Sequence, residues 1–126
     1  MTASRLFMDK YTQKYLEDVL TACKEVASFF ENQPKIFENF KGDTLRQRAV
    51  ERNVEIMGEA INQMLKQDSD MSLTNAKAIV ATRNRVIHGY DSVTPEFLWS
   101  LIVKHIPLLQ QEVENLISDN SETINE

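Results

Sequence analysis

The segment from Arg83 to Tyr90 concentrates the side chains of this chain that suit acid–base and phosphate chemistry. It reads Arg83-Asn84-Arg85-Val86-Ile87-His88-Gly89-Tyr90. An arginine holds a phosphate through a forked pair of hydrogen bonds and stays charged at any working pH, while a histidine moves a proton near neutrality. Together, Arg83 and His88 suit the chemistry of phosphodiester bonds.

The spacing of Arg83 and His88 is a difficulty for a site on one straight helix. Residues five positions apart point about 140° apart around the axis of an ideal α-helix. The helix could end near His88, with Gly89 releasing the backbone, or two copies of the segment could face each other across a two-fold axis. A purely structural alternative is that both side chains cap carbonyl groups at the helix end and complement its dipole.

The length and composition of the chain are those of one soluble domain. Its 126 residues suffice for one hydrophobic core, and 42% hydrophobic with 26% charged residues is an ordinary balance. No apolar run approaches the roughly 20 residues of a membrane helix, and the N-terminus shows neither the apolar h-region nor the cleavage site typical of a signal peptide. We predict a single domain over residues 1–117, a polar, flexible tail over residues 118–126, and a cytoplasmic location without membrane contact.

The charge of the chain argues against a protein that coats nucleic acid. The formal net charge is −5, whereas such proteins neutralise many phosphates with a basic surface. Local basic groups remain, and the candidate contacts for RNA or a partner protein are Arg46, Arg48, Arg52 and Arg85. For the first three, the alternative is a solvated helix face with local pairs to Glu51 and Glu55.

Cysteine and histidine are too sparse for a zinc site. The chain has one cysteine, Cys23, and two histidines, His88 and His105, without the spacing that zinc ligands require. We expect no metal and no cofactor. Cys23 lies among apolar residues at helical spacing and is interpreted as a small buried hydrophobe, and His105 as a packed or interfacial side chain.

Helical periodicity dominates the chain, and no segment alternates as a strand does. The predicted main helices cover residues 9–30, 43–66, 73–88 and 94–117. A short amphipathic piece lies around Phe37 and Phe40. Asp43 and Thr94 are the expected N-caps, while Pro107 predicts a kink or break after Lys104. Four main helices joined by short loops predict an all-α, antiparallel bundle.

Two parts of the sequence together resemble a known family. The first is the pattern Arg83-x4-His88-x-Tyr90 with Asn84, and the second is the helical segment QRAVERNVEIMGEA at residues 47–60. Both resemble the HepT-like branch of the HEPN superfamily, whose small helical proteins are usually encoded beside a minimal nucleotidyltransferase, the MNT protein. The resemblance extends over about residues 8–116.

The resemblance implies a metal-independent endoribonuclease that acts as the toxin of a type VII toxin–antitoxin pair. Its active site would form at a homodimer interface from Arg83 and His88 of both protomers. His88 would act as general acid or base, Arg83 would stabilise charge on the phosphorane, and Asn84 would orient the phosphate or the imidazole. The products would be a 2′,3′-cyclic phosphate and a 5′-hydroxyl.

The resemblance also implies a role for Tyr90. The matching tyrosine of HepT-like proteins accepts AMP from the MNT antitoxin, and the added charge and bulk would block the neighbouring phosphate site. Two alternatives stay open: a non-catalytic HEPN subunit that binds a nucleotide or targets the nucleotidyltransferase, and a plain helical oligomerisation module.

Overall fold

The computed structural model describes residues 10–67, 73–88 and 93–125, and the regular structure in these ranges is helical, without a strand. The all-α prediction is therefore confirmed. In chain order the elements are α2 (Lys10–Ser28), α3 (Phe37–Lys41), α4 (Thr44–Gln67), α5 (Ala76–His88), α6 (Pro95–Ser100), the π-helical turn η1 (Leu101–His105) and α7 (Ile106–Asn125).

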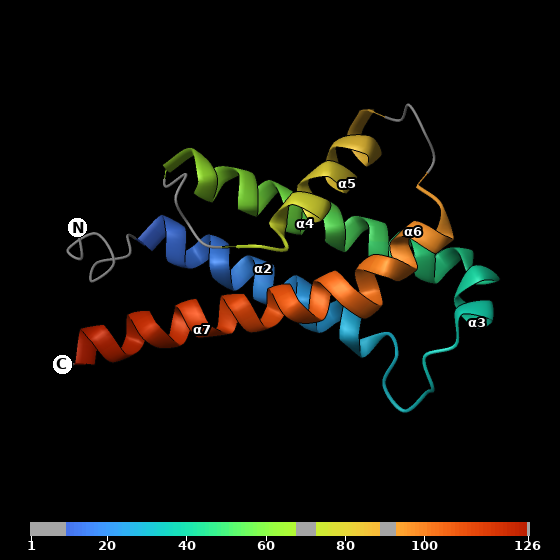
Figure 1. Ribbon diagram of the computed structural model, residues 1–126, viewed down its shortest axis with the longest axis horizontal. Helices are drawn as coiled ribbons and strands as arrows, with labels where there is room; N and C mark the ends of the chain where they lie inside the picture. The colour runs from blue at the N-terminus through green and yellow to red at the C-terminus, as the bar shows by residue number, and fades with distance from the viewer. Residues whose placement is uncertain (1–9, 68–72, 89–92, 126) are drawn as a thin grey trace.

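Helix α2 lies between α4 and α7 and packs on both, antiparallel to each (Figure 1). Helix α5 packs across the other side of α4, and its C-terminal end points away from the bundle (Figure 1). The predicted antiparallel arrangement is confirmed for α2 against α4 and α7, whereas α5 crosses α4. The functional consequence is that α5, which carries Arg83, is positioned mainly by its contact with α4.

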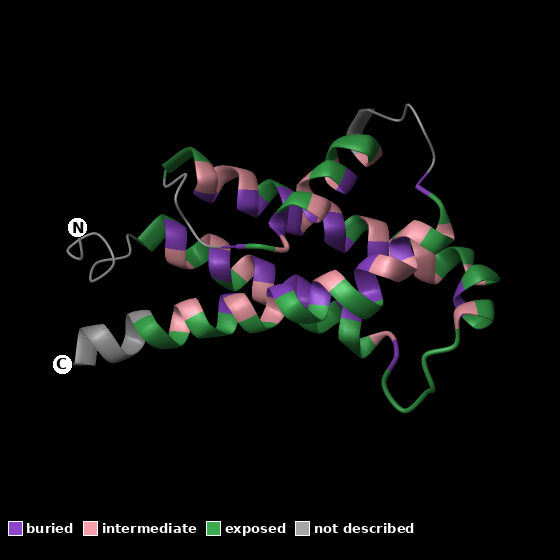
Figure 2. Cartoon of the chain, in the orientation of Figure 1, coloured by how far each residue is buried: buried purple, intermediate pink, exposed green. Residues whose placement is uncertain are grey.

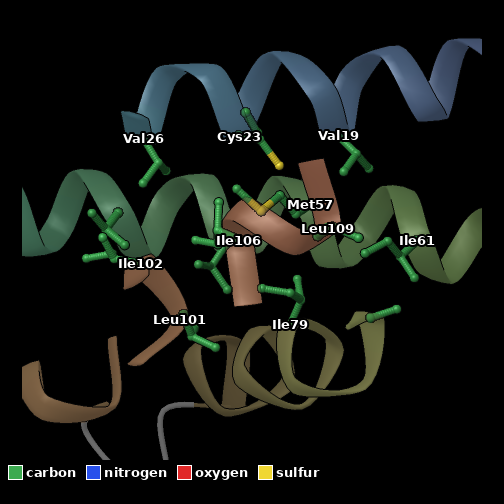
Figure 3. Close-up of a cluster of buried hydrophobic side chains, with 14 of the residues drawn as sticks. Val19, Cys23, Val26, Met57, Ile61, Ile79, Leu101, Ile102, Ile106 and Leu109 are labelled. Carbon is green, nitrogen blue, oxygen red and sulfur yellow. The ribbon is translucent and has the colours of Figure 1, made fainter. Parts of the chain in front are cut away.

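The core forms where the apolar faces of these helices meet (Figure 3). Its side chains include Val19, Cys23 and Val26 of α2, Met57 and Ile61 of α4, Ile79 of α5, and Leu101, Ile102, Ile106 and Leu109 of η1 and α7. Purple buried positions recur along the inner faces of α2 and α4, while their outer faces are green (Figure 2). This is the three- and four-residue spacing of apolar residues that the sequence shows.

Cys23 is one of these core side chains. It is fully buried, and burial raises the pKa of its thiol to about 12, with a smaller contribution from the negative charge of Glu114. A thiol with such a pKa is protonated at neutral pH and is a poor nucleophile. The interpretation of Cys23 as a small buried hydrophobe is confirmed.

Both predicted N-caps are present. The Asp43 carboxylate accepts a hydrogen bond from the backbone N–H of Arg46 at 3.0 Å, at the start of α4. The Thr94 hydroxyl accepts one from the backbone N–H of Phe97 at 3.1 Å, at the start of α6. Each cap satisfies a backbone donor that has no partner within the helix.

The last helical segment differs from the prediction in two ways. The expected disturbance near Pro107 is a π-helical turn, in which the backbone N–H of Ile106 bonds to the Leu101 carbonyl. A wider turn suits this position because a proline ring clashes with the carbonyl four residues earlier in a regular α-helix. The end predicted near Ile117 is wrong: α7 continues to Asn125, and no glycine or proline lies between Pro107 and that residue to end it.

Two other helix ends differ by smaller amounts. Helix α2 ends at Ser28, and the turn that follows contains Asn32 in a left-handed conformation with φ 59°. Helix α5 begins at Ala76 and not near Leu73, which is nevertheless buried and whose carbonyl accepts a hydrogen bond from the Ala76 N–H. Apolar periodicity therefore did not distinguish the turn at residues 73–75 from the first turn of the helix. No helix among the described residues is both long and apolar enough to cross a membrane.

The N-terminal end of α5 is anchored to α7 by Glu112. One carboxylate oxygen of Glu112 accepts hydrogen bonds from the Thr74 backbone at 2.9 Å and its hydroxyl at 2.5 Å, and the other lies 3.4 Å from two donors of Asn75. The same Asn75 side chain contacts Nδ1 of His105 at 3.1 Å. His105 is therefore a packed side chain held in a polar network, as one of its two interpretations predicted.

We expect Glu112→Gln to lower the free energy of unfolding by about 1 kcal/mol at pH 7, because the carboxylate binds the donors more strongly than an amide does. Burial alone would raise the pKa of Glu112, but the hydrogen bonds from Thr74 and Asn75 outweigh it and lower that pKa below its ordinary value of 4.5. The stabilisation is thus complete above the ordinary pKa and is lost as the pH falls through the lowered one.

Urea unfolding at pH 7 and at pH 3 measures this difference between the wild type and Glu112→Gln. The difference in free energy of unfolding between the wild type and Glu112→Gln should be smaller at pH 3 than at pH 7. Glu114→Gln, an exposed position on the same helix, is the matched control and should leave stability unchanged at both values. An equal loss in the two variants would contradict a specific role of Glu112.

Candidate active site

The stem of Arg83 lies directly against the backbone of α4 at Gly58. A Cβ atom added at Gly58 would be 2.5 Å from Cβ and 2.8 Å from Cγ of Arg83, closer than carbon atoms approach in proteins. Glycine at this position therefore allows α5 and α4 to come together with the arginine between them. The Arg83 side chain is 22% exposed, so its stem is covered while part of the group reaches solvent.

Two polar side chains hold the guanidinium of Arg83. Its Nη2 forms an ion pair with Oε2 of Glu59 on α4, and its Nη1 donates a hydrogen bond of 3.1 Å to Oδ1 of Asn84. Its Nε is buried and has no hydrogen-bond partner among the described residues. The arginine is thus fixed from two directions, by its own helix and by α4.

Arg83 borders a groove of about 320 Å³ beside α4. The lining residues come from α2, α4 and α5: Tyr15, Asp18, Arg52, Glu55, Ile56, Glu59, Ala60 and Arg83. The charges in it are mixed, because Arg52 pairs with Glu55 at 3.5 Å and Arg83 pairs with Glu59. Arg83, the residue predicted to bind a phosphate, therefore lies beside a groove that is open to solvent.

Helix α5 is continuous from Arg83 to His88. Within one protomer the backbone therefore directs these two residues about 140° apart, as the helical spacing requires. The His88 side chain, Gly89 and Tyr90 lie outside the described residues. The pairing of Arg83 with an imidazole and the position of the Tyr90 phenol thus stay predictions.

A model of the family described as ribonuclease HepT-like matches residues 19–116, which include about half of α2, about half of α7 and all the helices between them. This chain belongs to the HepT-like ribonuclease family. The family resemblance predicted from Arg83-x4-His88-x-Tyr90 and residues 47–60 is confirmed.

Relatives in bacteria and archaea are similar over most of their length. A protein of Caldanaerobacter subterraneus, named as a candidate RNase, is 31% identical over 109 residues, which cover 86% of this chain and 96% of the relative. Another so named, from Methanocaldococcus jannaschii, is 28% identical over 112 residues, 87% and 90% of the two chains. A probable ribonuclease HepT of Thermococcus cleftensis is 29% identical over 113 residues, which cover 86% of this chain and 98% of the relative. No solved structure matches the chain significantly.

The basic cluster of this HepT-like chain, formed by Arg46, Arg48 and Arg52, is engaged in local ion pairs. Arg48 contacts Glu51 at 3.2 Å and Arg52 contacts Glu55 at 3.5 Å, each three residues along α4. Arg46 pairs with Asp43 at 3.4 Å, and its guanidinium lies 5.3 Å from the centre of the Phe30 ring. These contacts favour the interpretation of a solvated helix face, and contact with RNA or a partner stays a prediction.

The fourth of those arginines, Arg85, lies on the exposed side of α5. Its guanidinium is 5.7 Å from the centre of the Phe97 ring in α6, a distance typical of a cation–π contact. It has no part in holding Arg83. Although only one residue separates them, Arg83 and Arg85 have different surroundings in the HepT-like fold.

Two residues of the site have roles that the sequence did not predict, Gly58 and Glu59. Glu59 was not singled out as a site residue, yet it pairs with an arginine 24 residues away. A glycine inside a long amphipathic helix is the one local signal, since it lowers helix stability and usually has a packing reason. That signal indicates that another part of the chain approaches α4 closely at Gly58, but it does not indicate which residue does so.

Proposed function

We propose that this HepT-like protein is a metal-independent endoribonuclease with Arg83 and His88 as its catalytic residues. The observation that supports this most directly is the state of Arg83, whose guanidinium is fixed on a helix surface at the edge of an open groove. A cation held in this way suits an anionic substrate, and the ribonuclease family to which the chain belongs suggests RNA.

In the proposed reaction, His88 removes the proton of a ribose 2′-hydroxyl. The 2′-oxygen attacks the adjacent phosphorus, and the bond from phosphorus to the 5′-oxygen breaks. The leaving 5′-oxygen takes up a proton from a second imidazole or from water. Arg83 stabilises the negative charge that develops on the phosphorane oxygens. The products are a 2′,3′-cyclic phosphate and a 5′-hydroxyl, and the nucleophile requires no metal-bound water.

The second imidazole is proposed to come from another copy of the chain. Because α5 directs Arg83 and His88 of one protomer about 140° apart, a two-fold arrangement of two such helices is a simple way to gather the groups. The end of α5 points away from its own bundle (Figure 1), which leaves it accessible to a second protomer. We propose a homodimer or higher oligomer with a composite site.

The experiment that tests the proposed activity compares two oligonucleotides with the purified, unmodified protein in the presence of EDTA. One is RNA, and the other carries a single 2′-deoxy nucleotide at the bond that is cleaved in the first. The RNA should be cut to a cyclic phosphate and a 5′-hydroxyl, and the deoxy substrate should stay intact at that bond. Binding of ATP or AMP without RNA cleavage would favour the non-catalytic alternative.

We also propose that the protein is the toxin of a pair with an MNT-type nucleotidyltransferase, which inactivates it by adenylylation of Tyr90. Only one residue separates Tyr90 from His88, so an added AMP would bring negative charge and bulk close to the candidate catalytic groups. The charge would compete with an RNA phosphate for Arg83.

Coexpression with the proposed MNT-type nucleotidyltransferase should add the mass of one or more AMP units to the wild-type protein. Tyr90→Phe, which lacks only the acceptor hydroxyl, should keep its unmodified mass. Intact-mass spectrometry measures both. An unmodified wild type beside an active transferase, or equal modification of Tyr90→Phe, would remove Tyr90 as the acceptor.

A further inference from the structure

Glu59 is itself held in position by a neighbour on α4. Its Oε1 accepts a hydrogen bond of 2.9 Å from Nε2 of Gln63, one helical turn later, and its Oε2 forms the ion pair with Arg83. Both carboxylate oxygens therefore have a protein partner. The contacts form a chain from Gln63 through Glu59 and Arg83 to Asn84, which joins the surfaces of α4 and α5.

This ion pair differs from the two that lie wholly within α4, although Arg46, which pairs with Asp43 just before that helix, is also 22% exposed. The pairs Arg48–Glu51 and Arg52–Glu55 each lie within one helix, and their arginine side chains are 71% and 68% exposed. Glu59–Arg83 joins two helices, and its arginine is only 22% exposed. An arginine with a covered stem and an anchored carboxylate partner has few conformations left, whereas an exposed one keeps most of its rotamers.

The pair also leaves hydrogen-bonding capacity for a ligand. A guanidinium has five N–H groups, of which Glu59 takes one and Asn84 takes one, while the Nε–H is buried. One N–H remains on each terminal nitrogen. Two such donors in the guanidinium plane match the spacing of two phosphate oxygens. Glu59 thus restrains Arg83 without using all the donors that a phosphate needs.

We propose that Glu59 is a positioning residue for RNA cleavage, which fixes the guanidinium of Arg83 in the orientation that receives the scissile phosphate. This inference rests on the proposed function of Arg83. Glu59 does not touch the substrate, and its effect is to remove the motion of Arg83 before RNA arrives. A misplaced charged group loses much of its effect on a transition state, since about 1 Å of displacement can reduce the rate about 10²-fold.

The kinetic test compares Glu59→Ala and Glu59→Gln with Glu51→Gln in single-turnover cleavage of the same RNA. Glu51→Gln is the matched control because it also removes a carboxylate from an ion pair on α4, but away from Arg83. We expect the maximal rate to fall at least tenfold in Glu59→Ala and less in Glu59→Gln, with the RNA concentration for half-maximal rate nearly unchanged. Glu51→Gln should match the wild type. Wild-type or faster cleavage by both Glu59 variants would overturn the proposal.

A second measurement tests the positioning without relying on activity. Restricted rotation of a clamped guanidinium keeps the NMR signals of its two terminal nitrogens separate, and free rotation averages them. We expect separate signals for Arg83 in the wild type and in Glu51→Gln, and averaged signals in Glu59→Ala. Averaged signals in the wild type would overturn the positioning role. A wild type with clamped Arg83 that cleaves no RNA would instead overturn the proposed ribonuclease function.

Discussion

Arg83→Lys is expected to lower kcat/KM for RNA cleavage about 10²- to 10³-fold while leaving the helical fold intact, because the variant loses charge stabilisation in the transition state. Lysine keeps the positive charge of Arg83 but not its planar fork. An ammonium group cannot bind Glu59, Asn84 and two phosphate oxygens in the same fixed geometry. Its aliphatic stem still covers Gly58, so the contact between α4 and α5 is retained.

The measurement is steady-state cleavage of a short RNA, with circular dichroism and urea unfolding to verify the fold. Lys77→Ala is the control, since it removes a whole charge from an exposed position on the same helix. It should stay within about twofold of the wild type, because an exposed charge acts weakly through solvent. Wild-type cleavage by Arg83→Lys would exclude a role for the guanidinium fork. An equal loss in Lys77→Ala would assign the effect to net charge.

A histidine that acts with Arg83 on the same bond gives a further check on this prediction. If both groups act in one step, the double variant Arg83→Lys/His88→Ala should be hardly slower than His88→Ala alone. Full additivity of the two losses would indicate that the residues act in separate steps or at separate sites.

Local signals in the sequence were sufficient to predict the main helices and the N-caps of two of them. Asp43 and Thr94 have oxygen atoms at the right place to accept from backbone donors, so these two boundaries depend on neighbouring residues alone. The end of α7 at Asn125 has no such signal, since polar residues are compatible with either a helix or a frayed tail. The π-helical turn η1 was predicted only as a disturbance, because Pro107 excludes a regular helix without specifying what replaces it.

The residues of the candidate site likewise include some that local sequence signals predicted and some that they did not. Arg83 and His88 were predicted as site residues from the types and spacing of residues in one segment, and Asn84 from the family resemblance. The partner of Arg83 was not predicted, because Glu59 lies on another helix, 24 residues away in the sequence. Which carboxylate meets the arginine depends on how α5 crosses α4, and that depends on the space left at Gly58. Long-range packing of this kind has no signature in periodicity.

Gly58→Ala is expected to destabilise the protein by about 1–3 kcal/mol, the usual cost of overpacking a close contact. Helix propensity alone predicts the opposite sign, since alanine is favoured over glycine in a helix by about 1 kcal/mol. The structural reason is that the new methyl group would lie 2.5 Å from Cβ of Arg83, an atom fixed to the backbone of α5. Rotation of the arginine side chain cannot relieve that contact, so the two helices must separate.

Gly42→Ala is the matched control for this prediction. At Gly42, the cap residue that follows α3, φ is −87°, and an added Cβ would be 3.7 Å from its nearest neighbour, a backbone oxygen of Glu38. Urea unfolding should therefore show Gly42→Ala within about 0.5 kcal/mol of the wild type. Because separation of the helices also moves Arg83 away from Glu59, Gly58→Ala should lose RNA cleavage under conditions where it is still fully folded. A folded Gly58→Ala variant with wild-type stability and cleavage would show that the approach of α5 to α4 at this residue matters neither to the fold nor to the site.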